Sequence, residues 1–443
     1  MIMNFPSYFT AGRFWIIKAW MLSLIAALTL SCIPAMCLYG FTWDEASPFL
    51  PPAYELKADD PFADTSQLTI PADPGSRSHG AKLTPRVFGS ACVFLAKKLS
   101  LHPYLPASLG GCLLLLAGVI AGYRITGDRA AGLATSLILA GLYATNACFS
   151  MNFEPKPFDG VAIGLIALTL ILVERPILFT ACAFLACFTD ERAIMSLGLI
   201  GLTIMLRGDM ERKKRLDHCW MIAGAVLAYF ITRSILSRVF SWSSADFSMV
   251  GDNLLITTTY WQLAGWSCFE GAWILILLAS WKSQSRVVSV LLLTGALGCV
   301  ASCLLVLDIS RASCFAFPLI FASLAALHRD SDTLNETNVS IPPQEKPSGT
   351  ASKSSAKTTS RMADKSRKKP RTSRSGQTAV TVPELDNGHS ISPPSNLRTP
   401  LFLAALISLM STNLEIIVDV VLQPCLSTPI WLLLYLSQLL MGY

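Results

Sequence analysis

Apolar residues in this chain occur in long blocks separated by short polar stretches. The first block, 14–40, exceeds the roughly 20 helical residues that cross a bilayer. We expect further crossings in the apolar blocks at 106–123, 130–150, 158–173, 220–238, 265–281, 287–306 and 312–327. Two last apolar runs, 400–421 and 426–442, predict a C-terminal transmembrane hairpin within 400–443. The pattern predicts an all-α polytopic membrane protein with about 10–12 transmembrane or re-entrant helices.

One polar region between these blocks has an internal pattern of its own. Residues 41–105 form the first long loop, and within it residues 84–100 carry an apolar stripe flanked by Arg86, Lys97 and Lys98. Such a stripe with basic flanks is typical of a helix that lies on the membrane surface.

The run 176–206 differs from the other blocks because charges interrupt it. Two apolar pieces are separated by Thr189-Asp190-Glu191-Arg192, and each piece is short for a full crossing. We favour a broken hairpin whose charged corner faces a water-filled cavity, because irregular backbone at membrane depth is tolerated only there or inside protein. One long crossing is the alternative.

Composition supports the membrane class and separates one segment from the rest. Hydrophobic residues make up 52% of the chain and charged residues 14%. Most of the formal net charge of +6 lies in residues 329–400, which hold twelve Lys or Arg against seven Asp or Glu. Because residues 329–399 are also rich in Ser, Thr and Pro, we predict a disordered basic linker there, after a membrane domain over 1–328.

Basic residues in the short loops define an orientation. The loop residues Arg124, Arg129, Arg175, Lys282 and Arg286 all fall on one side of the predicted crossings, together with the cluster 207–215. Cytoplasmic loops carry an excess of Lys and Arg, so this side is predicted to be cytoplasmic and the linker with it. We therefore predict a multi-pass protein of the bacterial inner membrane.

Acidic residues at membrane level collect on the opposite, outward side. An ionisable residue inside the membrane costs about 2.5–3.5 kcal/mol on insertion scales and usually has a partner or a function. The outward acids are Asp44, Glu45, Glu154, Asp159, Asp190, Glu191 and Asp308, with Arg192 and Arg311 among them. A polar cavity that opens outward explains this asymmetry.

Several of these residues have both a functional and a structural interpretation. Asp44 and Glu45 directly follow the first crossing, where a carboxylate can accept a proton from a hydroxyl or amine nucleophile or can simply be solvated. Asp159 opens a crossing, where an acid also complements the helix dipole. Asp308 and Arg311 are three residues apart and can pair with each other, or Arg311 can bind phosphate through its planar fork.

Metal chemistry is not indicated by the spacing of the potential ligands. The thirteen cysteines show no paired spacing with nearby histidines, and most lie in apolar runs as small hydrophobes. We therefore assign no metal site. A divalent metal that bridges Asp44, Asp159 and a phosphate stays open.

The layout around these acids resembles a known enzyme class. A first crossing that ends in Asp44-Glu45, a long outer loop with a surface helix, and Asp159 at the start of a later crossing are similar to the GT-C superfamily of polytopic glycosyltransferases, including protein O-mannosyltransferases and lipid A aminoarabinose transferases. The resemblance covers about 14–330 in layout and few residues in motif. Three features depart from it: Thr189-Asp-Glu-Arg stands where those families often have a Thr-Lys motif, no soluble outer domain follows the last crossing, and the long predicted cytoplasmic linker is unusual.

The resemblance implies transfer of a sugar from a polyprenyl-phosphate donor on the outer face of the membrane. Asp44, Glu45 and Asp159 would then be catalytic. The residues expected to bind substrate are Arg86, Asp190, Glu191, Arg192, Asp308 and Arg311. The donor and membrane lipid are the expected partners, nucleic acid is not, and no motif indicates a protein partner. An ion-coupled transporter that uses the same acids and a non-catalytic membrane scaffold are the alternative functions.

Overall fold

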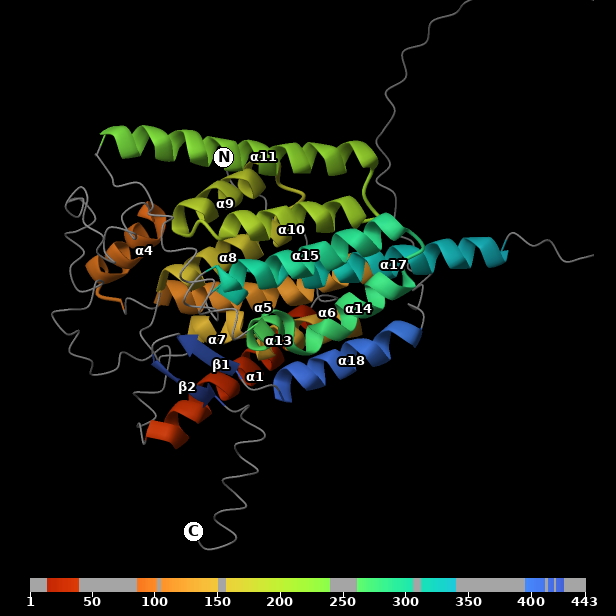
Figure 1. Ribbon diagram of the computed structural model, residues 1–443, viewed down its shortest axis with the longest axis horizontal. Helices are drawn as coiled ribbons and strands as arrows, with labels where there is room; N and C mark the ends of the chain where they lie inside the picture. Colours follow the sequence, from red (N-terminus) through yellow and green to blue (C-terminus); the bar gives the residue numbers. More distant parts are fainter. Residues whose placement is uncertain are drawn as a thin grey trace, which may run out of the picture. The chain divides into compact units, whose positions relative to one another are not determined.

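The described part of the chain is almost entirely helical (Figure 1). The computed structural model describes residues 14–39, 86–101, 105–149, 157–239, 261–305, 312–339, 395–410, 413–417 and 420–425. The helices of the first half are α1 (Phe14–Tyr39), α4 (Val87–Lys98), α5 (Leu105–Thr126), α6 (Arg129–Gly141), α7 (Tyr143–Phe149), α8 (Pro157–Ile171), α9 (Pro176–Thr189), α10 (Ala193–Leu206) and α11 (Arg212–Val239). The later elements are α13 (Trp261–Phe269), the 3₁₀ turn η4 (Glu270–Ala272), α14 (Trp273–Lys282), α15 (Arg286–Leu304), α17 (Pro318–Val339), α18 (Ser395–Met410), β1 (Asn413–Ile417) and β2 (Val420–Cys425).

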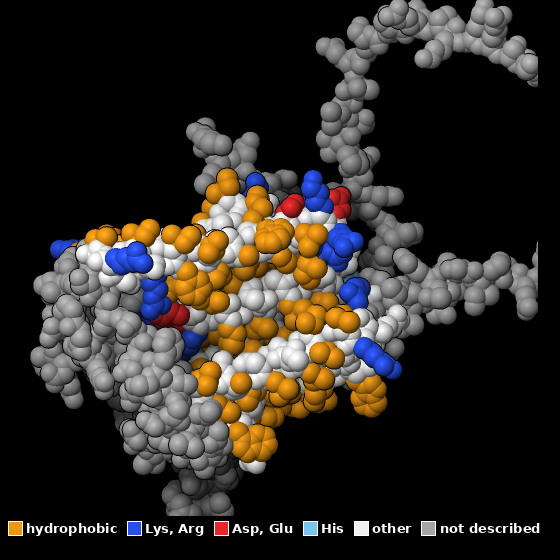
Figure 2. Space-filling model, turned by 45° about the horizontal axis from the view of Figure 1, so that its top comes forward, with side chains coloured by type: hydrophobic (Ala, Val, Ile, Leu, Met, Phe, Trp, Pro, Cys, Tyr) orange, Lys and Arg blue, Asp and Glu red, His pale blue; other side chains and the backbone are white. Residues whose placement is uncertain are grey.

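Several of these helices are long and apolar enough to cross a membrane. Four single helical segments meet this condition among the described residues, and the bent pair α6–α7 makes a fifth if it counts as one span. The four are Leu105–Thr126, Arg212–Val239, Ala264–Lys282 and Arg286–Leu304. Figure 2 shows apolar side chains over the middle of the visible helices and Lys and Arg side chains toward the ends. These features are consistent with a multi-pass membrane protein.

Helices α8, α9, α10 and α11 run alternately in opposite directions, so their connections lie at two ends (Figure 1). At one end, Arg124 donates to the carbonyl of Ile171 at 2.7 Å, which joins the end of α5 to the end of α8. Arg215 donates to the carbonyl of Arg207 at 2.8 Å, which joins α11 to the residue after α10. We call this the basic end. The opposite end holds the start of α8 and the connection from α9 to α10.

Close packing of α5 against α8 depends on glycine. A Cβ on Gly110 would overlap the carbonyl of Gly160, and a Cβ on Gly164 would lie 2.6 Å from the Cα of Gly110. Small residues let two helix backbones approach in a membrane, where dispersion contacts replace the hydrophobic effect between helices. The contact between Gly110 and Gly160 is next to Asp159, so it also determines where that carboxylate lies.

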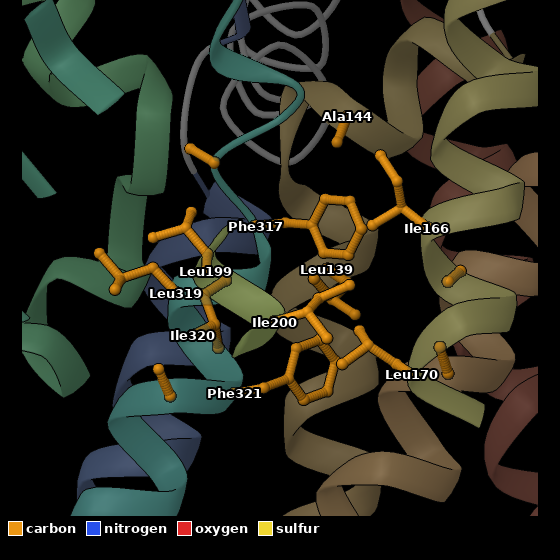
Figure 3. Packing of buried hydrophobic residues seen from close by; sticks show 14 of the residues in the cluster. Leu139, Ala144, Ile166, Leu170, Leu199, Ile200, Phe317, Leu319, Ile320 and Phe321 are labelled. Atoms are coloured by element: carbon orange, nitrogen blue, oxygen red, sulfur yellow. The ribbon is translucent and has the colours of Figure 1, made fainter. Parts of the chain in front are cut away.

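The apolar core joins helices that are distant in sequence (Figure 3). Phe317, directly before α17, and Phe321, in the first turn of α17, lie among Leu139 of α6, Ile166 and Leu170 of α8, and Ile200 of α10. These side chains are all fully or almost fully buried. Because α17 packs against both α8 and α10, it supports the helices on either side of the α9–α10 connection.

Two predicted crossings contain breaks that the apolar pattern did not indicate. Helices α6 and α7 meet at 66°, because Leu142 is extended and the hydroxyl of Thr145 donates to the carbonyl of Leu139. In the predicted crossing 265–281, the 3₁₀ turn η4 separates α13 from α14, and Glu270 has a φ of 46°. An apolar run predicts that a segment lies within the membrane, but tertiary packing decides whether the segment forms one continuous helix.

The predicted 176–206 hairpin is present as two helices, α9 and α10, with Asp190 to Arg192 between them. The segment 84–100, predicted as a membrane-surface helix, contains the helix α4. The structure does not confirm the predicted count of about 10–12 crossings, because several apolar helices are shorter than a full span.

The C-terminal prediction differs more strongly from the structure. The predicted linker, 329–399, is helical at both of its ends. Helix α17 continues past its start to Val339, and helix α18 begins at Ser395, before its end. The apolar run 400–421 is not one helix, because it changes to the antiparallel strands β1 and β2 after α18. Closely spaced Ile and Val from 416 to 421 favour strands. The second predicted crossing, 426–442, lies outside the described residues.

The chain divides into two units by its internal contacts. The first comprises 1–333 and 392–443, and the second comprises 334–391. Of the second unit the structure describes only the last residues of α17.

Candidate functional site

Charged side chains from four parts of the chain meet at the connection between α9 and α10. We call this group the charged corner, and its members are Arg86, Asp159, Asp190, Glu191, Arg192 and Arg233. They come from the residue before α4, the first turn of α8, the α9–α10 connection and the C-terminal part of α11. Proline helps to define where helices α8 and α9 begin, because Pro157 and Pro176 occupy their first turns, where proline is favoured.

Asp190 is the centre of the charged corner. One oxygen, Oδ1, accepts from the backbone N–H of Arg192 at 2.9 Å, which closes a tight turn of the kind that Asp favours. The other oxygen, Oδ2, lies 2.9 Å from Arg86 Nη1 and 2.7 Å from Arg192 Nη2. The Asp190 side chain is 0% exposed, so two guanidinium groups replace the water that a buried carboxylate loses.

Arg192 links this turn to α8. Its Nη2 lies 2.8 Å from Asp159 Oδ1, and its Nε donates to Asp190 Oδ1 at 2.8 Å. The guanidinium also lies over the ring of Phe315, 4.8 Å from the centroid. Planar delocalised cations suit both contacts, so Lys would not replace Arg here. The first-turn acid of α8 thus has a specific cation partner in addition to the helix dipole.

Glu191 lies at the outer side of the charged corner. Its Oε1 accepts from Arg233 Nη1 at 2.7 Å, and its Oε2 lies 3.4 Å from Arg86 Nη2. The Arg233 guanidinium also donates to the hydroxyl of Tyr229, one turn earlier on α11. The side chain of Glu191 is 32% exposed, in contrast to the fully buried Asp190 beside it.

The formal charges of the charged corner cancel, since three guanidinium groups face three carboxylates. Such an arrangement can orient a polar ligand without a large net charge at membrane depth, and its arginines can bind phosphate in pairs. One donor is left over: the buried Nε of Arg86 has no acceptor among the described residues. Removing Asp190 would leave Arg86 and Arg192 without the carboxylate that they share at the buried side of the group.

The structure brings together five of the residues predicted from sequence, namely Arg86, Asp159, Asp190, Glu191 and Arg192. The other four predicted site residues, Asp44, Glu45, Asp308 and Arg311, lie outside the described residues.

Arg233 and Tyr229 are members or neighbours of the charged corner that the sequence interpretation missed. Both lie in the predicted crossing 220–238. An arginine inside an apolar crossing, near its C-terminal end, was the available signal, because intramembrane ionisable residues usually have a partner.

Another buried acid, Glu270, lies apart from the charged corner. Glu270, in the turn η4, is 1% exposed, and Gly271 packs against α18 so closely that a Cβ would lie 2.6 Å from the backbone nitrogen of Ser408. Across the described residues, no three His, Cys, Asp or Glu side chains are arranged to hold a metal ion. No protein-family model, curated protein or solved structure matches this chain.

Proposed function

We propose that this protein is an integral-membrane glycosyltransferase that moves a sugar from a polyprenyl-phosphate donor to an acceptor on the outer face of the membrane. The observation that carries the proposal is the charged corner itself. Acids and arginines far apart in sequence converge at one end of helices that are otherwise apolar, and Asp159 is held there by Arg192 at 2.8 Å.

The reaction assigns roles to these residues. Asp44 or Glu45 accepts the proton of an acceptor hydroxyl or amine as it attacks the anomeric carbon of the sugar, and the polyprenyl phosphate leaves. Fixed cations stabilise the negative charge that develops on the leaving phosphate, and Arg86, Arg233 and Arg311 are the candidates. Asp159, oriented by Arg192, positions the acceptor or the sugar.

The same assignment places the charged corner at the outward face. The basic end then lies in the cytoplasm together with the linker, as the distribution of Lys and Arg favours. A polyprenyl-phosphate sugar reaches this position within the membrane, and its phosphate lies at the level of the arginines.

The test combines retained lipid with activity. Gently purified protein is analysed by lipid mass spectrometry, and membranes that contain wild type or the Asp44→Asn variant are assayed for transfer of labelled sugar from total polyprenyl-phosphate sugars. We expect a co-purified polyprenyl phosphate or its sugar conjugate, and loss of transfer in an inserted, well-expressed Asp44→Asn protein. Only bulk phospholipid together with no transfer by wild type would refute the proposal.

One observation favours the ion-coupled transporter as a second candidate. Transporters use discontinuous helices near their binding sites, and here a second broken element, α13–η4–α14, carries the buried Glu270. Uptake of solutes into proteoliposomes under an imposed proton gradient separates the two functions. Gradient-driven uptake that is lost in Glu270→Gln would support the transporter, whereas the transferase requires no gradient.

A further inference from the structure

The two adjacent acids of the α9–α10 connection have different environments. Asp190 is 0% exposed, and both of its oxygens have contacts shorter than 3 Å. Glu191 is 32% exposed and uses one short contact, to Arg233, and one long contact, to Arg86. Asp190 therefore belongs to the permanent structure of the turn, whereas Glu191 can leave its position without exposing a buried charge pair to the membrane interior.

The arginines that hold Glu191 have spare donor capacity. The contact from Arg86 Nη2 to Glu191 Oε2, at 3.4 Å, exceeds the usual 2.7–3.2 Å of an N–H···O hydrogen bond. The buried Nε of Arg86 has no acceptor among the residues described here. A guanidinium offers five N–H donors in a fork, so Arg86 can serve a further anionic group.

A carboxylate between two arginines resembles the binding arrangement of a phosphate. Both anions accept paired N–H donors from guanidinium, and phosphate does so with more oxygens. We propose that Glu191 occupies the place of a ligand phosphate and swings outward when a lipid phosphate binds, so that Arg86 and Arg233 transfer their donors to the phosphate oxygens. This inference rests on the proposed function and identifies which group on the donor this part of the charged corner recognises.

The helices that carry Glu191 and Arg233 also offer a place for the hydrocarbon chain of the same ligand. Between α9 and α11 lies an open apolar groove of about 550 Å³, whose walls include Phe184, Met221 and Ala228. Ala228 precedes Arg233 by five helical residues, a rise of about 7.5 Å along α11. In this proposal the prenyl chain lies in the groove, and the long side chains of Arg86 and Arg233 reach its phosphate beyond the end of the groove.

The experiment measures binding of farnesyl phosphate, a short prenyl phosphate, to the full-length protein in detergent by isothermal titration. Farnesol serves as the ligand without phosphate, and inorganic phosphate as the ligand without a chain. Glu191→Gln removes the competing charge and keeps the side-chain shape, and we expect it to tighten binding roughly fivefold, since a partly exposed ion pair contributes up to about 1 kcal/mol. Glu174→Gln, an exposed acid after α8, is the matched control and should leave the affinity unchanged.

The arginine side of the proposal is tested in the same way. Arg233→Gln should weaken farnesyl phosphate binding roughly tenfold, because a charge-assisted bond to phosphate is lost. Arg238→Gln, an exposed arginine one to two turns further along α11, removes the same charge outside the charged corner and should have little effect. Glu191→Ala provides a second variant in case the amide of Gln makes new contacts.

The outcomes distinguish this inference from the proposed function. If both Glu191 variants bind farnesyl phosphate more tightly than wild type, and all proteins bind farnesol weakly, the proposed exchange of the Glu191 carboxylate for a lipid phosphate is supported. If wild type binds farnesyl phosphate but the Glu191 variants bind equally or more weakly, Glu191 is a structural partner and the exchange is wrong, while the transferase proposal stands. If neither wild type nor variants bind farnesyl phosphate, both proposals fail.

Discussion

The two ends of the helices use arginine for different purposes. At the basic end, Arg124 and Arg215 donate to backbone carbonyls, that of Ile171 at the end of α8 at 2.7 Å and that of Arg207 directly after α10 at 2.8 Å. At the charged corner, Arg86, Arg192 and Arg233 instead meet carboxylates from other elements. The basic end also has two single ion pairs, Arg207 with Asp209 and Arg398 with Asp128, whereas the charged corner connects six charged side chains in one network.

The difference bears on where the proposed ligand would bind. A cation that binds helix-end carbonyls complements the helix dipole and needs no acid, which is the ordinary role of a basic residue at a C-terminus. Paired buried charges contribute little net stability, because desolvation offsets their attraction. Their convergence at one end of an apolar protein is therefore better explained by a ligand than by stability.

The largest expected effect is a difference in chemical labelling between the two ends, because they are predicted to face opposite sides of the membrane. In spheroplasts treated with a membrane-impermeant amine reagent, we expect labelling of Lys98 on α4 but none of Lys213, Lys214 or Lys282 at the basic end, all of which are exposed. Mass spectrometry of the labelled peptides measures this, and permeabilised cells provide the control in which all four react. Labelling of the basic end in sealed spheroplasts would reverse the orientation.

Asp190→Asn should be the most destabilising substitution in the charged corner. It leaves Arg86 and Arg192 without their shared carboxylate, and breaking a buried pair from one side costs about 3–5 kcal/mol. Denaturant unfolding in detergent measures the change in the free energy of unfolding. Asp209→Asn removes the exposed partner of Arg207 at the basic end and should cost less than about 1 kcal/mol. Equal costs at both ends would remove the distinction between them.

Gly110→Ala tests the packing that positions Asp159. The added Cβ would overlap the carbonyl of Gly160, so we expect a loss of about 2 kcal/mol, within the range for overpacked cores. Gly198→Ala on α10 is the control: nothing lies within 4 Å of its Cβ, and alanine is the better helix former. The same unfolding titration compares them. A harmless Gly110→Ala would mean that α5 and α8 can separate without cost.

Arg124→Gln at the basic end should have the smallest effect. Loss of its charge-assisted bond to the carbonyl of Ile171 should lower the free energy of unfolding by about 1 kcal/mol. Farnesyl phosphate affinity, measured by titration, should stay the same, because this arginine lies at the end opposite the charged corner. A clear fall in affinity would show that both ends take part in binding.

Much of this organisation could be predicted from local pattern. The apolar blocks predicted the helical membrane class, the basic flanks of 84–100 predicted the helix now seen as α4, and the charges after Thr189 predicted the break between α9 and α10. These predictions depend on the cost of polar groups at membrane depth, which acts on each segment separately.

The breaks at Leu142 and Glu270 could not be predicted in this way. Both lie in runs that are apolar on either side, and α18 packs against both α6 and η4. The change from helix to strand after α18 also followed local β preference rather than hydropathy. Hydropathy gives the depth of a segment in the membrane, and only packing decides where its helix bends or ends.

The sequence by itself predicted that the acids at membrane level fall on one side of the apolar blocks and the basic residues of the short loops on the other. Only the tertiary structure decided which of them pair, because Arg86 and Asp190, or Glu191 and Arg233, lie many residues apart and no local rule selects their partners. It also added Arg233 to the group, since the rotation of α11 turns this residue toward Glu191. Charge at membrane depth is a property of each segment, whereas ion pairing depends on how separate helices pack.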